Sequence, residues 1–511
     1  MLIPPNNHVV KTAPARVSIF GCSTRSSRGK WAPSGRDGTP SVARRMRSLL
    51  RFGSTWLLLM MWLLYGCASL PRIGNLLDER LIPENAEVGV RGIYGSGIAD
   101  EIIELTAENA TVSEALKRFI RIERELLGET PVHGNKVKLL VDTPAALRAM
   151  FGAMEKAEDH IHIDTYLLAD DSVGQNLSAL LLKKRSEGVE IRIIYDSIGS
   201  RSSSRPFFER LRNGGVELIE FHPVDFPGSL NLPRLSIRDH RKLLIVDGKI
   251  AFTGGINIAD GFARGTFPEI RGKRGKLRNR DTQMSIEGPA AAEFQKAFIN
   301  VWNGKAIEAG HGLLREEWGR YFPYLEEKGH ELVRAVPVIA GGGGHEMYKA
   351  YMAAIRNARS RIWITQAYFV PSQELLEALR EAARRGVDVR LVLPAVSDHP
   401  IVQAASRSHY GFLLEAGIRV YERLDSMLHA KTAVVDGVWS TVGSSNLDFR
   451  SFLYNNEINA VVIGRRFGAR MEKVFLRDVG RSRMVVLEEW KRRPVRERIT
   501  EALVSLVERW L

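Results

Sequence analysis

Cysteine is almost absent from this chain of 511 residues. The two cysteines are Cys22 and Cys67, and no cysteine follows Cys67. A disulfide framework and a metal centre with cysteine ligands both need several cysteines at suitable spacing. Both are therefore excluded for the part of the chain after Cys67, which is long enough for two or three domains.

Positive charge is scarce where a nucleic-acid-binding protein would carry it. The formal net charge is +14, but residues 1–66 hold ten Lys and Arg and a single Asp, a net charge of +9. Only +5 remains for residues 67–511. Nucleic-acid binding calls for a strongly basic surface, so this distribution argues against a nucleic-acid partner.

Long hydrophobic runs are lacking at the N-terminus. The apolar stretch Trp56–Leu64 is shorter than the roughly 20 residues that span a membrane as a helix. It follows Arg47 and Arg51 and has the proportions of a signal peptide. Residues 1–45, rich in Ser, Pro, Gly and Arg, are predicted to be a disordered leader, or to be untranslated because Met46 is the true start.

Residues 46–70 allow different kinds of attachment. Leu64, Gly66 and Cys67 resemble the cleavage box of bacterial lipoproteins, in which the cysteine is lipidated. The alternative is an uncleaved signal anchor. In both cases the Arg-rich flank stays cytoplasmic and the body lies on the outer, periplasmic side. A third interpretation is an organellar transit peptide, because residues 11–51 are rich in Arg and Ser.

What the chain does contain is an internal repeat. Residues 160–171 and 361–372 are strand-like, and each is followed by a helix-like stretch, a glycine and a second apolar strand. Corresponding positions in the two copies lie 198 to 202 residues apart. Strands that alternate with helices predict an α/β fold with a sheet covered on both faces. We therefore predict two similar α/β sandwich halves.

The repeat also predicts the domain organisation. The glycine-rich run at 341–344 is the expected linker between the halves. The predicted segments are a helical connector (71–133), a first domain (134–335), a second domain (336–488) and an amphipathic C-terminal helix (489–511).

A short polar motif, HxKxxxxD, occurs once in each half. Its residues are His240, Lys242 and Asp247 in the first half, and His429, Lys431 and Asp436 in the second. An Asn follows each His by 17 positions, and the second Asn-containing turn also holds a Ser; these residues are Asn257, Asn446 and Ser444. Residues two apart on a strand point to the same side, so each His projects with its Lys. The duplication predicts a two-fold phosphate site at the interface between the halves.

Two histidines suit phosphodiester exchange. One neutral and one protonated imidazole supply a nucleophile and a proton donor near neutral pH. Attack by one histidine would give a phosphohistidine and a two-step transfer. The lysines and the neighbouring polar side chains are placed to neutralise the pentacoordinate state; they are Lys242, Lys431, Asn257, Asn446 and Ser444. This scheme requires neither a metal nor a cofactor.

The motif aspartates suggest a different role. Asp247 and Asp436 each precede a Gly at the end of an apolar strand. Asp-Gly at such a position is a hairpin signal. We therefore predict that both aspartates, although part of the motif, serve the structure.

The duplicated motif resembles the phospholipase D superfamily, and more narrowly the bacterial cardiolipin synthases. The segments that carry the resemblance are 240–260, 280–290, 397–400 and 428–459, and it covers roughly residues 134–490. The best-known members begin with two membrane helices, whereas this chain has one short apolar stretch.

The resemblance implies roles for individual residues. His240 would be the nucleophile and His429 the general acid, although the symmetry of the sequence does not choose between them. A nucleophilic imidazole needs its far nitrogen held by an acceptor, usually a carboxylate. The resemblance assigns Glu457 to His429 and Asp281 to His240.

Three other features each have two interpretations. His160, His162 and Asp164 share one strand face, which we expect to meet solvent or the partner half rather than a metal. The basic loop 264–280 either attracts anionic phosphatidylglycerol or is simply solvated. The C-terminal helix (489–511) either lies on a membrane surface or docks on the body through its apolar stripe.

The family resemblance predicts a phosphatidyltransferase that joins two phosphatidylglycerols into cardiolipin and releases glycerol. Phosphatidylethanolamine as donor or free glycerol as acceptor would use the same site. The rival predictions are a phospholipase D-type hydrolase that releases phosphatidic acid, a phosphodiester nuclease, and a non-catalytic scaffold that binds anionic lipid. The expected partners are phospholipid and a bacterial membrane surface; the oligomeric state is left open.

Overall fold

The computed structural model describes residues 109–128, 130–224, 236–263, 278–314, 318–341 and 345–508. The chain divides into two compact units, Met1–Ala68 and Ser69–Leu511, and all described residues belong to the second. The predicted leader, the apolar segment with Cys67, most of the connector and most of the basic loop lie outside the described residues.

The strands of the described unit fall into two series. The first series is β1 (Val132–Val141), β2 (His160–Thr165), β3 (Glu190–Asp196), β4 (Glu217–Phe221), β5 (Arg238–Asp239), β6 (Lys242–Val246), β7 (Ile250–Gly254), β8 (Arg278–Arg280) and β9 (Thr282–Glu287). The second series is β10 (Glu331–Val338), β11 (Arg361–Gln366), β12 (Phe369–Val370), β13 (Asp388–Pro394), β14 (Arg419–Arg423), β15 (Ser426–Leu428), β16 (Lys431–Val435), β17 (Trp439–Gly443), β18 (Leu447–Asp448), β19 (Asn455–Ile463) and β20 (Ser482–Met484).

The helices follow the same division. With the first series go α4 (Ala110–Arg121), η1 (Ile122–Leu126), α5 (Thr143–Glu155), α6 (Ser172–Ser186), α7 (Arg205–Asn213), α9 (Asp260–Ala263), α10 (Ala291–Ala306) and α11 (Trp318–Tyr321). With the second go α12 (Glu346–Asn357), α13 (Gln373–Arg384), α14 (Pro400–Ser408), α15 (Tyr410–Glu415), α16 (Phe449–Leu453), α17 (Arg465–Val479), α18 (Leu487–Lys491) and α19 (Val495–Ser505).

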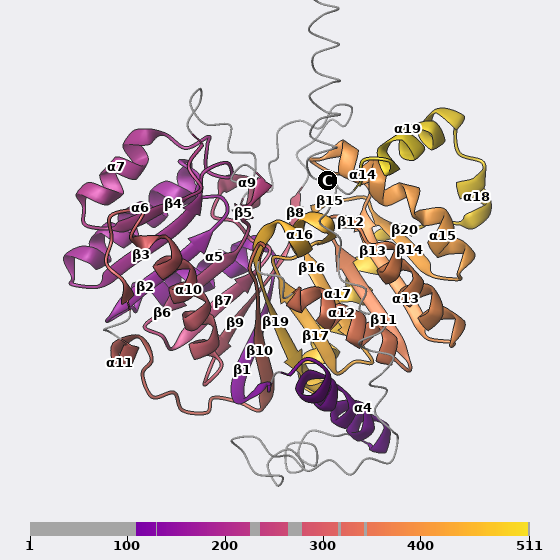
Figure 1. Ribbon diagram of the computed structural model, residues 1–511, viewed down its shortest axis with the longest axis horizontal. Coiled ribbons are helices and arrows are strands. Elements are labelled where there is room, and N and C mark those ends of the chain that lie inside the picture. Colours follow the sequence, from indigo (N-terminus) through magenta and orange to yellow (C-terminus); the bar gives the residue numbers. More distant parts are fainter. Residues whose placement is uncertain are drawn as a thin grey trace, which may run out of the picture. The chain divides into compact units, whose positions relative to one another are not determined.

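The two halves repeat one strand order within a continuous sheet of 16 strands. The first half runs β1-β9-β7-β6-β2-β3-β4 and the second runs β10-β19-β17-β16-β11-β13-β14-β20. Antiparallel pairing of β1 with β10 joins them, so these strands lie side by side at the centre of Figure 1. The predicted α/β fold with two similar halves is confirmed. β10 spans the division expected between residues 335 and 336, so the second half of the sheet begins at Glu331.

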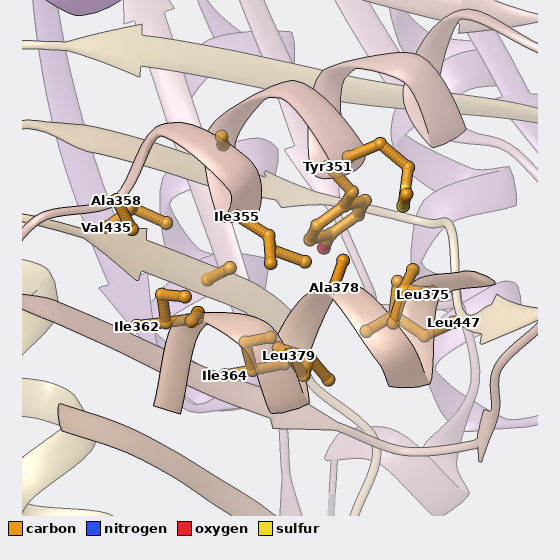
Figure 2. Close-up of a cluster of buried hydrophobic side chains, with 14 of the residues drawn as sticks. Tyr351, Ile355, Ala358, Ile362, Ile364, Leu375, Ala378, Leu379, Val435 and Leu447 are labelled. Carbon is orange, nitrogen blue, oxygen red and sulfur yellow. The ribbon is translucent and has the colours of Figure 1, made fainter. Parts of the chain in front are cut away.

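Helices cover both faces of the sheet. In the first half α5, α6 and α7 pack on one face through an apolar core. On another face, α10 and α17 share one core that runs under both halves. In the second half α12 and α13 pack over β11 and β16, and Figure 2 shows Tyr351 and Leu379 within this core. The helix α4 adds Phe119, which is fully buried there and contributes about 1.5–3 kcal/mol by burial.

The helix ends are specified locally and in the same way in both halves. The carboxylate of Asp171 accepts hydrogen bonds from the backbone at the start of α6, and the Ser372 hydroxyl does so at the start of α13. Gly188 and Gly386 follow these helices with φ of 95° and 88°, a conformation that favours glycine. Each helix therefore stops where the next buried strand must begin.

The C-terminal segment forms α18 and α19 rather than one helix, and Pro494 lies at the N-terminal boundary of α19. Val495, Ile499 and Leu503 of α19 are exposed, whereas Glu501 is its buried residue. The alternative in which this helix docks on the body through its apolar stripe is therefore wrong.

Candidate active site

Strands that cross from one half to the other bring the two motifs together. β5, just before His240, pairs with β19 of the second half, with Asn456 opposite Asp239. β8 of the first half pairs with β15, with Arg280 opposite Leu428, just before His429. Each histidine therefore lies beside a strand of the other half, and the site forms at the junction.

His240 is held by a carboxylate of the second half. Its Nδ1 lies 3.0 Å from both carboxylate oxygens of Glu457. Glu457 is fully buried and also accepts a hydrogen bond from Ser451 Oγ at 2.9 Å. Because Glu457 fixes Nδ1, Nε2 is the nitrogen of His240 that can react.

His429 is held in the corresponding way by the first half. Its Nδ1 lies 2.8 Å from Oδ2 of Asp281, which is fully buried. The assignment of Glu457 to His429 and of Asp281 to His240 is therefore wrong, although the two carboxylates do correspond. The reason is the strand crossing: Glu457 lies in β19, which pairs with the strand just before His240, and Asp281 directly follows β8, which pairs with the strand just before His429.

The motif lysines are buried at the start of strands. Lys242 begins β6 and its Nζ donates to the carbonyl of His240 at 2.6 Å. Lys431 begins β16 and donates to the carbonyl of His429, also at 2.6 Å. Burial lowers the pKa of Lys242 to about 7, and the charge of Lys431 adds to this effect. Because the charge of one lysine acts on the other, the two buried amines together form a site for an anion.

The two histidine pairs differ electrostatically. Burial puts the pKa of His240 well below its ordinary value, and the charges of Lys242 and Lys431 lower it further. Burial also lowers the pKa of His429, but there Asp281 opposes the shift. Burial raises the pKa of Glu457 to about 7. Burial also acts to raise the pKa of Asp281, but the charge and hydrogen bond of His429, the charge of Lys431 and the backbone N–H of Thr282 together outweigh it, so this pKa falls. The His429 pair therefore favours an imidazolium more than the His240 pair does.

The amide and hydroxyl residues lie in turns under the carboxylates. Asn257 and Asn446 are both buried, and the side-chain oxygen of each has no hydrogen-bond partner among the described residues. The hydroxyl of Ser444 accepts from the backbone N–H of Ile458 at 2.9 Å and contacts Glu457. In the first half a Cβ at Gly255, the residue corresponding to Ser444, would overlap the carboxylate of Asp281.

The motif aspartates lie at the far ends of their strands, roughly 16 Å from the lysines. Asp247 has φ of 53° in the β6–β7 turn and accepts the backbone N–H groups of Glu158, Asp159 and His160. Asp436, with φ of 51°, accepts three such groups in the second half and pairs with Arg118 of α4. Each aspartate fixes its hairpin to the loop before β2 or β11, at the opposite end of the strand from the motif lysine.

Asp247→Asn is expected to lower stability and to spare turnover. The NH2 group that replaces one carboxylate oxygen cannot accept a backbone N–H, and the remaining oxygen accepts without the negative charge, which costs about 1–3 kcal/mol. Thermal unfolding should therefore shift down by several degrees, while the turnover of the folded fraction stays within about twofold of wild type. Loss of turnover in a variant that unfolds at the wild-type temperature would contradict the structural role.

Two tyrosines flank the site, and sequence reasoning did not identify them, because their place in the repeat was the only signal. Tyr166 packs against His240 with ring centroids 5.1 Å apart, and Lys242 Nζ lies 5.2 Å from its ring. Tyr368 lies 6.5 Å from the His429 ring and donates a hydrogen bond to Asp398 at 2.8 Å. An aromatic face beside an ammonium stabilises its charge.

Arg241, inside the first motif, was also missed. It is 1% exposed and donates to the carbonyls of Glu457 and Val338, both in the second half. Its Nη1 lies 3.7 Å from Asp164 of the first half. This guanidinium therefore connects the two halves directly behind His240.

The histidines of β2 do not face solvent or the partner half. His160, His162 and Asp164 are all fully buried within the first half, because helices cover both faces of the sheet. His162 stacks on Phe298 of α10 at 4.4 Å. The expectation that this strand face is exposed or meets the partner half is wrong.

Comparison with known proteins decides the family. The family model described as "Cardiolipin synthase, PLD-like domain" matches residues 150–302 and 351–479, one stretch in each half. A relative named cardiolipin synthase from Geobacillus kaustophilus is 36% identical over 386 residues, which is 75% of this chain and 74% of the relative. The cardiolipin synthase of Listeria innocua is 34% identical over 374 residues, 73% of this chain and 75% of the relative. This chain belongs to the cardiolipin synthase family.

That finding confirms the family predicted from the duplicated motif. Among solved structures, phosphatidylserine synthase from Haemophilus influenzae aligns with a TM-score of 0.56 at 12% identity, over 73% of this chain and 95% of that one. This likeness shows a shared fold and carries no conclusion about substrate. The residues at the junction between the halves therefore carry the evidence for function.

Proposed function

We propose that this chain transfers a phosphatidyl group from one phosphatidylglycerol to another, which forms cardiolipin and releases glycerol. The observation that carries the proposal is the pair of His–carboxylate contacts across the halves, with two buried lysines beside them, in a chain of the cardiolipin synthase family.

In the first step, Nε2 of neutral His240 attacks the phosphorus of the donor. The bond between phosphorus and the oxygen of the headgroup glycerol breaks, and His429 gives its proton to that oxygen. The products are glycerol and a phosphatidyl group on His240. The stronger preference for the charged imidazole at His429 supports this division of roles.

In the second step, the glycerol hydroxyl of a second phosphatidylglycerol attacks the phosphatidyl group. His429 takes the hydroxyl proton, and the bond between phosphorus and His240 breaks. Cardiolipin leaves, and both histidines return to their starting protonation states. Water in place of the second lipid would give phosphatidic acid by the same step.

Lys242 and Lys431 stabilise the charge that develops on the phosphoryl oxygens. The amides of Asn257 and Asn446, both buried in the turns that follow the motif strands, donate through their NH2 groups to the same oxygens. Ser444 acts indirectly, because its hydroxyl orients Glu457. The two carboxylates hold the tautomers of the histidines.

The pH profile should reflect Lys242. Its pKa of about 7 means that the free enzyme holds the charge below that pH and loses it as the pH rises through 7. Because His429 must also keep the proton that it gives to the leaving glycerol, we expect kcat/KM to fall more steeply than tenfold per pH unit above 7, while the part due to Lys242 is smaller in kcat because a bound phosphodiester stabilises the ammonium. Profiles from pH 5.5 to 9 check this. In Lys242→Arg the part due to Lys242 should vanish and the part due to His429 should remain, since a guanidinium stays protonated; a wild-type kcat/KM that falls no more steeply than that of Lys242→Arg would contradict the assignment.

A lipid substrate places the enzyme at a membrane, and we propose attachment through residues 46–70, either as an anchor or through lipidated Cys67, with the body on the periplasmic side. Within the described ranges, no helix is both long and apolar enough to cross a bilayer.

Mass spectrometry of lipids tests the function. Purified full-length protein is incubated in EDTA with phosphatidylglycerol vesicles, with and without phosphatidylethanolamine, beside His240→Ala. Cardiolipin with free glycerol, absent in the variant, is the expected result. Phosphatidic acid alone would make the protein a hydrolase, and no lipid product would overturn the proposal.

A further inference from the structure

The last helix of the described chain has its polarity reversed relative to an ordinary surface helix. In a globular protein the apolar stripe of a helix faces the core and the charged side faces water. In α19 the charged residue Glu501 is only 4% exposed, whereas Leu503 and Leu506 are 62% and 72% exposed. The helix is the yellow ribbon at the edge of the second half in Figure 1.

Acidic residues dock this helix on the body. The carboxylate of Glu501 pairs at 2.5 Å with Arg493, in the link between α18 and α19, and the guanidinium of Arg493 lies over the ring of Trp490 in the core of the second half. Seven residues further on, the carboxylate of Glu508 lies 3.1 Å from Nε2 of His409. α19 also packs against α14. These contacts fix which side of the helix points outward, so the exposure of the apolar stripe follows from the docking.

The outward side is continuous and has a basic margin. Its apolar residues recur at helical spacing and are Val495, Ile499, Leu503, Leu506 and Val507, each at least 41% exposed. At 100° per residue, Arg498 falls beside Val495 on one side of this stripe, and Arg496 falls near its other edge, between Leu503 and Val507. Both arginines are exposed, and neither forms an ion pair with any other described residue.

The helix α14, against which α19 packs, begins close to the active site. Asp398, which accepts the hydrogen bond of Tyr368 beside His429, comes two residues before α14. Ile401 of α14 is itself 57% exposed. In Figure 1, α14 and α19 lie at the same end of the described unit as β8 and β15, the strand pair that places His429.

We propose that the outer face of α19 binds the surface of a bilayer that contains anionic lipid, with the apolar stripe among the acyl chains and Arg496 and Arg498 at the headgroups. An apolar stripe with cationic margins is the pattern of helices that lie in the membrane interface. Docked in this way, the helix holds the mouth of the site against the leaflet. The inference rests on the proposed function in that the same leaflet supplies the substrate.

The test uses the full-length chain and the double variant Ile499→Glu/Leu503→Glu. The matched control is Ile307→Glu/Tyr324→Glu, which places two acids at exposed apolar positions of the first half (69% and 91% exposed). Cardiolipin formation is measured on phosphatidylglycerol vesicles and on short-chain phosphatidylglycerol dispersed as monomers. Amide hydrogen exchange of residues 495–507 is measured with and without the vesicles.

The α19 variant should lose roughly tenfold or more in activity on vesicles and keep wild-type activity on the monomeric lipid, because each buried leucine or isoleucine contributes about a factor of ten to partitioning. Vesicles should protect residues 495–507 from exchange in wild type and in the control, but not in the α19 variant. Protection by neutral vesicles of equal extent would overturn the role of anionic lipid.

Other outcomes would overturn the docking itself. One such outcome is wild-type activity of the α19 variant on vesicles, with no protection of residues 495–507 from exchange in any of the proteins. A dimer in solution that only the α19 substitutions dissociate would mean that a second copy covers the stripe. Absence of product from both lipid forms in wild type would refute the proposed function, yet hydrogen exchange would still decide whether the helix binds the bilayer.

Discussion

His240→Ala is expected to lose phosphatidyl transfer by about 10⁴-fold or more. The imidazole forms the covalent bond to phosphorus, and no other described side chain is placed to replace it in the pair with Glu457. The protein should stay folded, since the ring is at the surface of a site rather than in an apolar core. Product formation is measured by lipid mass spectrometry, and folding by thermal unfolding.

His429→Ala separates the two histidine roles. On phosphatidylglycerol it should be as inactive as His240→Ala, because the leaving glycerol needs a proton. With a phosphatidyl ester of p-nitrophenol, whose leaving group needs no proton, it should still form an adduct on His240 that alkaline peptide mapping detects. An adduct on His429 in the His240→Ala variant would reverse the roles. Normal synthesis by His429→Ala would refute the two-histidine scheme.

Glu457→Gln is expected to reduce turnover by about 10²–10⁴-fold, because Glu457 holds the nucleophile His240, which belongs to the motif of the other half. A glutamine no longer favours the His240 tautomer that leaves Nε2 available. The first, rapid release of p-nitrophenol from the phosphatidyl ester (the burst) should therefore slow sharply. Asp281→Asn is the matched control: it should slow synthesis from phosphatidylglycerol but leave the burst close to wild type, since it acts on His429.

Double-variant cycles on unfolding stability test the same crossed pairing without activity. His240→Ala and Glu457→Gln should be coupled, because the groups are in contact at 3.0 Å. His240→Ala and Asp281→Asn should be additive within about 0.5 kcal/mol. The reverse pattern, or a burst that only Asp281→Asn slows, would restore the pairing of each histidine with the carboxylate of its own half.

Local patterns in the sequence were sufficient for several features. The α/β class and the two halves follow from repeated strand, helix and glycine signals, which act over a few residues. The structural role expected of Asp247 is supported by its left-handed turn and backbone hydrogen bonds. Family membership follows from the twin motifs, whose spacing is unchanged between the halves.

Only the tertiary structure decided how these parts combine. His240 and Glu457 are separated by 217 residues, and His429 and Asp281 by 148. The family resemblance paired each histidine with the carboxylate of its own half, because the sequence does not show that β5 and β8 cross to β19 and β15. The same holds for α19: its periodicity shows an apolar stripe, but the acidic contacts that turn this stripe outward involve residues brought together by the fold. Period and spacing are local properties, whereas the partner of a buried charge depends on which distant strands pair.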